Sequence, residues 1–170
     1  ERVPIFEEDT GYVLHRRAMT HGFKMLRNNF FNLCEQKIQP TKQQGPGTYY
    51  GKLDSQHIID WRSDASNINR LIRVYSSPYN GSITFFRNRP VIIHEAKIIE
   101  GEKYIAQGSG KIVDLVDNKP VISCGDGFLL ITKFHFAENS ATMKGRNLLI
   151  NKNIKKEVVE SLKPPMGSEK

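Results

Sequence analysis

The residue types that most often perform catalysis are present in this 170-residue chain, but their spacing matches no familiar site. No two histidines have the His-Glu-x-x-His spacing of a zinc peptidase, and two cysteines are too few for a four-ligand zinc site. The sequence also has no Gly-x-Ser-x-Gly elbow and no Walker loop. We therefore expect neither a catalytic residue nor a metal site. The residues concerned are His15, His21, His57, His94, His135, Cys34 and Cys124.

Two glycine-rich tripeptides resemble phosphate-binding loops only superficially. Gly108-Ser109-Gly110 and Gly125-Asp126-Gly127 both lie between expected strands, whereas a phosphate-binding loop precedes a helix. They are predicted to be turns. Trp61, the only tryptophan, is expected to anchor the core rather than to stack on a ligand.

The charge balance favours an anionic partner. Lys and Arg number 25 against 18 Asp and Glu, which gives a formal net charge of +7 and a pI near 9.4. RNA and phosphorylated sugars are partners of this kind, although solubility alone also explains such an excess. Because no apolar run reaches the roughly 20 residues of a spanning helix and no leader is evident, we expect a cytoplasmic protein without membrane contact.

Two helices and then a series of strands are expected to position these residues. Capping residues Asp9 and Thr10 precede apolar side chains at helical spacing, which predicts a helix over 10–36. The Pro- and Gly-containing run 39–47 predicts a linker. A second helix is expected from the cap at Ser63 or Asp64 until Pro78 and Asn80-Gly81. Its apolar positions are Ala65, Ile68, Leu71, Ile72 and Tyr75.

From residue 82 the pattern becomes that of strands. Runs rich in Ile, Val and Phe alternate with turn residues, which predicts an α+β fold, mainly β, in which a linking helix and hinge precede a small OB-like barrel. The expected strands are 82–86, 91–99, 111–116, 120–123 and 128–136. The region 151–162 is expected to form a short terminal helix, and 164–170 a frayed tail.

One stretch of sequence resembles a known family. Thr48-Tyr49-Tyr50-Gly51-Lys52-Leu53, Ile59-Asp60-Trp61, Ile72-Arg73, and Pro78 followed by Gly81 are similar, in order and spacing, to the hinge and C-terminal domain of the formyltransferases. That family includes methionyl-tRNA formyltransferase and the amino-sugar formyltransferases. Asp9-Thr10 and Cys124-Gly125-Asp126-Gly127 extend the resemblance, whereas Asn80 and His94 stand where the family usually has Pro and often has Trp.

The resemblance implies four regions and a function for the parent protein. Residues 1–38 would end a catalytic domain, 39–57 would be the hinge, 58–163 the OB-like C-terminal domain and 164–170 a tail. The complete enzyme would transfer formyl from 10-formyltetrahydrofolate to a primary amine, on aminoacyl-tRNA or a nucleotide-linked amino sugar. Its catalytic Asn, His and Asp would lie in an upstream domain, so this chain should bind no cofactor and be inactive alone.

The resemblance also implies which residues have structural and binding roles. Structural roles fall on Asp60, Trp61, Arg73, Pro78 and Gly81, where Arg73 would complement the helix dipole or bond to Asp60 or to backbone carbonyls. Basic residues would contact an acceptor through phosphate. The candidates are Lys42, Lys52, Arg87, Arg89, Lys133, Lys144 and Arg146.

Two other functions are consistent with the same sequence. A stand-alone OB-type module could bind nucleic acid by stacking bases on aromatic residues, although in small barrels such residues usually fill the core. An exposed apolar patch could instead serve a dimer or a scaffold. The aromatic residues concerned are Tyr49, Tyr50, Phe85 and Phe86.

Overall fold

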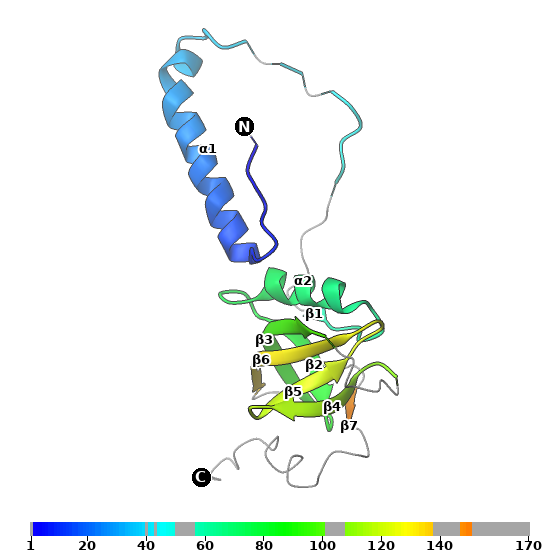
Figure 1. Ribbon diagram of the computed structural model, residues 1–170. Coiled ribbons are helices and arrows are strands. Elements are labelled where there is room, and N and C mark those ends of the chain that lie inside the picture. The colour runs from blue at the N-terminus through cyan, green and yellow to red at the C-terminus, as the bar shows by residue number, and fades with distance from the viewer. Residues whose placement is uncertain are drawn as a thin grey trace, which may run out of the picture. The chain divides into compact units, whose positions relative to one another are not determined.

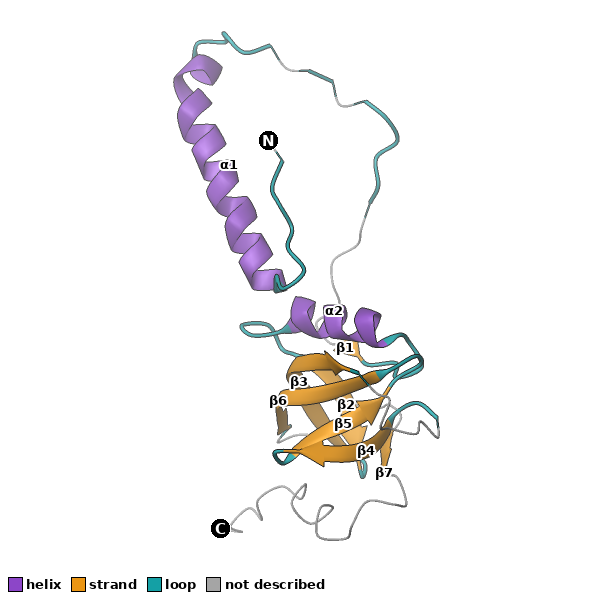
Figure 2. Cartoon of the chain, in the orientation of Figure 1, coloured by secondary structure: helices purple, strands orange, loops and turns teal. Residues whose placement is uncertain are grey.

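The computed structural model describes residues 2–39, 41–42, 44–49, 57–100 and 108–137, together with the backbone of 147–150. The chain forms two compact units, Glu1–Ser55 and Gln56–Lys170, and the division lies within the expected hinge 39–57. Figure 1 labels the helices and strands, and Figure 2 distinguishes them by type. The fold is α+β, as expected. None of the helices in the described ranges combines the length and apolar character that a membrane crossing requires.

The first unit contains one long helix, α1 (Gly11–Cys34), which confirms the expected helix to within two residues at each end. Thr10 is the N-cap, and its Oγ1 accepts a hydrogen bond from the amide of Val13 at 3.2 Å. The helix ends in a Schellman motif: Gln36 adopts a left-handed φ of 57°, and the amide of Lys37 donates to the carbonyl of Asn32 at 2.9 Å.

The segment before α1 is fastened to the first turns of the helix. Asp9 and Arg17 form a bidentate ion pair, in which Arg17 Nη2 donates to Asp9 Oδ1 at 2.7 Å. Arg17 also donates to the carbonyl of Pro4 at 2.8 Å, and its guanidinium lies over the ring of Phe6. No residue of α1 is buried, so its apolar side chains remain on the surface of this unit.

The second unit, called the β unit below, begins with β1 (His57–Ile58) and α2 (Ala65–Tyr75). The buried side of α2 comprises Ala65, Ile68, Ile72 and Tyr75, as the spacing predicts, but Leu71 is exposed. Gly81, with a left-handed φ of 78°, lies in the turn that follows and donates its amide to the carbonyl of Tyr75 at 2.8 Å.

In the described part of the chain, seven strands form one sheet in the order β1-β2-β3-β6-β5-β4-β7. The five expected strands are confirmed as β2 (Ser82–Phe86), β3 (Arg89–Ile99), β4 (Lys111–Val116), β5 (Lys119–Ser123) and β6 (Phe128–Phe136). The short β1 and β7 (Asn147–Ile150) were not expected, and β7 pairs in parallel with both β2 and β4. The expected helix 151–162 and tail 164–170 lie outside the described residues.

Two hairpins have tight two-residue turns. Arg87-Asn88 joins β2 to β3 and Asp117-Asn118 joins β4 to β5, and all four residues have positive φ. This pattern is the type I′ turn, whose twist matches that of antiparallel strands. Both turns separate strands that the sequence pattern predicts.

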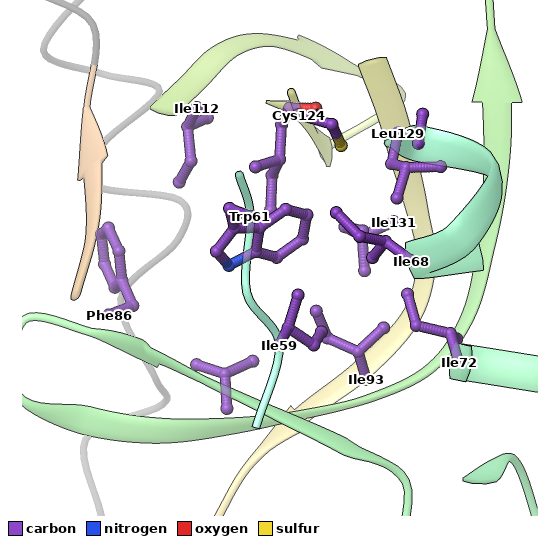
Figure 3. Close-up of a cluster of buried hydrophobic side chains, with 13 residues drawn as sticks. Ile59, Trp61, Ile68, Ile72, Phe86, Ile93, Ile112, Cys124, Leu129 and Ile131 are labelled. Carbon is purple, nitrogen blue, oxygen red and sulfur yellow. Dashed lines mark hydrogen bonds between the residues drawn. The ribbon is translucent and has the colours of Figure 1, made fainter. Parts of the chain in front are cut away.

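The core of the β unit lies between α2 and the strands. Trp61 is only 6% exposed and lies among Ile59, Ile68 and Ile131 (Figure 3), which confirms it as a core residue. Phe85 and Phe86 are also buried, so the hypothesis that they stack on bases is wrong. They fill space inside the protein, as small β folds require of most of their aromatic residues. Tyr49 is 93% exposed, and Tyr50 lies outside the described residues.

Candidate functional site: a docked helix and a basic rim

The segment that leads into α2 is held against the strands by hydrogen bonds from two neighbouring positions. The amide of Ile59 donates to the carbonyl of Ile83 at 2.8 Å. Trp61 Nε1 donates to Thr84 Oγ1 at 2.9 Å, and both side chains are buried. Because a buried donor without a partner is costly, this bond fixes the indole in a single orientation.

The Gly125-Asp126-Gly127 turn docks α2 from the other side of the core. Asp126 Oδ1 accepts a hydrogen bond from the amide of Ala65, the first residue of α2, at 2.7 Å. The local N-cap Asp64 makes no side-chain capping bond, so a carboxylate 61 residues away caps the helix instead. Its charge also complements the positive end of the helix dipole. The tripeptide is a turn, as expected, with a role that the pattern did not reveal.

Gly125 allows this turn to approach the chain before α2 closely. Its amide donates to the carbonyl of Ser63 at 2.9 Å, and a Cβ at this position would lie 2.3 Å from the carbonyl oxygen of Arg62. Any larger residue would displace backbone rather than a flexible side chain. Glycine is therefore required here for the turn to reach the helix N-terminus.

The other residues with expected structural roles border this docking contact. Asp60 is exposed and forms a bidentate pair with Arg62, whose Nε donates to Oδ1 at 2.8 Å. Arg73 is half-buried in the last turn of α2, where a cation complements the helix dipole. Pro78 is exposed and follows a cis peptide bond.

Two titratable groups of the β unit are shielded from solvent. Cys124 is buried in the core, and burial together with the nearby Asp126 raises the pKa of its thiol to about 12. His57 stacks on Tyr75, its Nδ1 lies 3.2 Å from Ser82 Oγ, and burial lowers the pKa of its imidazole. At neutral pH neither group is therefore charged. Within the described ranges, no three His, Cys, Asp or Glu side chains are grouped to hold a metal ion.

Of the four candidate acceptor-binding residues that the structure describes, it brings two together. Arg87 and Arg89 are exposed on either side of Asn88 in the β2–β3 hairpin. Lys133 lies on β6, 3.6 Å from Glu95, and is about six residues, or roughly 20 Å, along β3 from the hairpin. Lys42 is exposed in the first unit, while Lys52, Lys144 and Arg146 lie outside the described residues.

Both hairpin arginines lie over aromatic rings at one end of the β unit. The guanidinium carbon of Arg87 is 5.5 Å from the ring centroid of Phe86, and that of Arg89 is 5.4 Å from the centroid of Phe136. Such contacts hold a guanidinium in place while its N–H groups remain available to an anion.

A small apolar cavity lies at the same end of the β unit, and a third cation lies next to one of its lining residues. The cavity is about 30 Å³, is lined by Phe86, Phe136 and Pro120 among others, and is too small for a nucleobase. Lys119, exposed at the start of β5, precedes the lining residue Pro120. We call Arg87, Arg89 and Lys119 the basic rim. The sequence did not indicate Lys119 as a candidate, because only the fold places the start of β5 at the same end of the β unit as the β2–β3 hairpin.

A helix docked on a small sheet, with cations displayed at one end, defines an α+β module suited to anion contact. The particular family follows from comparison with known proteins. The family model described as the formyl transferase C-terminal domain matches residues 52–153, more than half of the chain, so the chain belongs to that family. The resemblance to the formyltransferases is thereby confirmed.

Curated relatives agree with this assignment. Methionyl-tRNA formyltransferase of Clostridium botulinum (strain Alaska E43 / Type E3) is 28% identical over 138 residues, which cover 80% of this chain and 43% of that protein. The methionyl-tRNA formyltransferase of Acidithiobacillus ferrooxidans (strain ATCC 53993 / BNL-5-31) is 31% identical over 129 residues, with coverages of 74% and 40%. That of Caldanaerobacter subterraneus subsp. tengcongensis is 29% identical over 154 residues, with coverages of 89% and 48%.

The chain spans less than half the length of these relatives. Among solved structures, HypX from Aquifex aeolicus superimposes with a TM-score of 0.48 at 19% identity, over 65% of this chain and 19% of HypX. A superposition this partial does not by itself assign a fold or a function.

Proposed function

We propose that this chain is the C-terminal part of a 10-formyltetrahydrofolate-dependent formyltransferase that formylates a primary amine. This part would help to bind the acceptor and to orient the catalytic domain, which supplies the folate site and the reacting groups. The relatives are named methionyl-tRNA formyltransferases, which favours aminoacyl-tRNA over a nucleotide-linked amino sugar as the acceptor. We place this function in the cytoplasm, where aminoacyl-tRNA is used.

The observation that carries the proposal is the basic rim. Arg87 and Arg89 flank one turn residue, and each guanidinium is already held over a phenyl ring. An arginine ordered before binding loses less side-chain entropy when it contacts a phosphate. Lys133 has Glu95 as a neighbour at 3.6 Å, which makes it a weaker candidate than the rim. The rim therefore offers positioned cations for the RNA backbone.

The first unit suits a role in orienting the catalytic domain. Its helix α1 buries no residue within the unit and exposes large apolar side chains, among them Met19, Phe23 and Phe31. Exposed apolar surface of this extent is typical of a contact with another domain or protein. We propose that residues 1–38 pack against the upstream catalytic domain and that 39–57 are the hinge.

The β unit would then be the C-terminal domain, residues 58–163, followed by the tail 164–170. The antiparallel series β2-β3-β6-β5-β4 and the pairing of β7 with both β2 and β4 support an OB-like barrel. Ligand-binding barrels of this type use surface loops and strand faces for contact. The rim on the β2–β3 and β4–β5 hairpins fits that use.

The acceptor can be tested by equilibrium binding of the full chain at low ionic strength. The ligands would be methionyl-acceptor tRNA, an unstructured RNA of the same length and a nucleotide-linked amino sugar. We expect the folded tRNA to bind most tightly, because the rim and a duplex backbone are both rigid. Failure to bind any RNA at low salt would exclude the tRNA acceptor, and binding of the nucleotide sugar alone would favour the other branch.

A further inference from the structure

Two histidines on neighbouring strands form a stacked pair on the β unit. The rings of His94 on β3 and His135 on β6 have centroids 5.3 Å apart and planes inclined by 14°. The strands are antiparallel, with Ile92 opposite His135, and their register shifts between Ile93 and Glu95. His94 therefore lies at an irregularity of the ladder, and its stacking partner lies on the strand across from it.

The surroundings of His94 suit a neutral ring better than a charged one. Its side chain is half-buried, and its Nδ1 is buried without a hydrogen-bond partner. A Cβ added to Gly81 would lie 3.0 Å from His94 Cε1, so the ring packs closely against the turn after α2. A protonated imidazole needs an acceptor at both nitrogens, so charging this ring would leave an N–H unsatisfied.

Most of the groups around His94 also oppose its protonation. Burial, His135 and Lys133 lower the pKa of His94, in that order of size, while Glu95 raises it. The charged residues of α2, which packs against β3, are Arg70 and Arg73. The strand β2 carries no charged residue, and the turn Ser76–Gly81 has Tyr79 as its one titratable side chain.

The geometry does not suit a metal site. The nitrogen lone pairs of two nearly parallel rings point along parallel planes and do not converge on one ion about 2.0 Å from each. No third His, Cys, Asp or Glu in the described part of the chain completes a ligand group with them. The pair is better suited to respond to protons.

We propose that the stacked pair His94–His135 is a pH-sensitive clasp on the β3–β6 ladder. When His94 is neutral, its ring stacks on that of His135 and helps to hold the two strands together where the register shifts. When the pH falls, protonation of His94 leaves a buried N–H without an acceptor and loosens the pairing of Val91–Ile93 with Phe134–Phe136.

The direction of the pH effect follows from linkage. An unfolded histidine titrates near pH 6.5, and the folded state keeps His94 neutral below that value. Between the pKa of His94 in the folded chain and its higher pKa in the unfolded chain, the unfolded chain binds more protons. Folding therefore becomes less favourable as the pH falls through this range. The stabilisation is complete above about pH 7 and is lost on acidification.

The test is urea unfolding of the full chain at pH 7.5 and pH 5.0. Trp61, the single tryptophan, is buried in the β unit, so its fluorescence reports on that unit alone. We expect the urea midpoint of the native chain to be lower at pH 5.0 than at pH 7.5. This fall in midpoint should be smaller in His94→Gln and in His135→Gln. His15→Gln is the control, because His15 is exposed in the other unit. His57→Gln should remove a separate part of the fall, since burial also lowers the pKa of His57.

A second measurement reads the clasp without unfolding the protein. The ring-proton resonances of His94 are followed by NMR against pH in the native chain and in His135→Gln, which changes an exposed side chain and should fold. We expect His94 to titrate at higher pH when His135 is absent. The proposal is wrong if His94 titrates at the same pH in both proteins, or if both variants retain the full midpoint fall.

Discussion

Replacing Asp126 should destabilise the β unit more than replacing Asp64, although Asp64 is the residue that precedes α2. Asp126 Oδ1 accepts the bond from Ala65 at 2.7 Å, whereas Asp64 makes no side-chain bond to the helix backbone. Loss of a helix-capping bond costs about 1 kcal/mol, and loss of a carboxylate at a helix N-terminus costs about 0.3–1 kcal/mol. We therefore expect Asp126→Ala to lower the free energy of unfolding by about 1–2 kcal/mol.

The assay is equilibrium urea unfolding at pH 7.5, followed by Trp61 fluorescence. With a slope of about 1–3 kcal/mol per molar urea, the midpoint of Asp126→Ala should fall by roughly 1 M. Asp64→Ala should cost less, about 0.3–1 kcal/mol, since it removes a carboxylate near the helix N-terminus and a 3.2 Å bond to Asn67 but no capping bond. Asp126→Asn keeps an acceptor oxygen and should recover part of the loss.

The relative order of these variants decides the outcome. If Asp64→Ala costs as much as Asp126→Ala, the helix is capped locally and the docking role of the Gly125-Asp126-Gly127 turn is refuted. If Asp126→Asn is as unstable as Asp126→Ala, the charge rather than the hydrogen bond provides the stabilisation. In that case added salt, which screens the charge, should lower the free energy of unfolding of the native protein until it approaches that of the variants.

Two further predictions concern the same core. Gly125→Ala should destabilise by about 1–3 kcal/mol or prevent folding, because its Cβ would lie 2.3 Å from the Arg62 carbonyl oxygen. Gly127→Ala, whose Cβ would lie 3.4 Å from a neighbouring side chain, should cost less in the same unfolding assay. In native protein at pH 8, a thiol reagent should modify exposed Cys34 rapidly and Cys124 only after unfolding, since burial keeps that thiol protonated. Equal reaction of both cysteines in folded protein would contradict the structure.

Local patterns in the sequence predicted most of the elements. Helical spacing located α1 and α2, and runs of Ile, Val and Phe located the five longer strands, because these signals act within one segment. The two short strands β1 and β7 were missed, since two to four residues are too few to show a period. Leu71 was placed on the buried side of α2 because spacing alone cannot tell where the buried face ends.

Contacts between distant segments were the least predictable. Asp126 caps a helix 61 residues earlier in the chain, and a turn residue gives no sign of such a partner. The stack of His94 on His135 depends on the register of two strands, and the Lys133–Glu95 contact depends on the same ladder. Arg87 was a candidate as a basic residue, whereas its contact with the Phe86 ring could be seen only in the structure.

The measurement that tests the basic rim most directly is the salt dependence of tRNA binding by the full chain. Each phosphate that the protein no longer neutralises should reduce the magnitude of the slope of log affinity against log salt by about 0.7–0.9. We predict that Arg87→Gln/Arg89→Gln lowers the magnitude of this slope by about 1.4–1.8 relative to the native chain, because two phosphates would then go unpaired. Lys133→Gln, which removes a cation paired with Glu95, should change the slope much less. Equal slopes for the native chain and the double variant would show that the rim does not touch the acceptor.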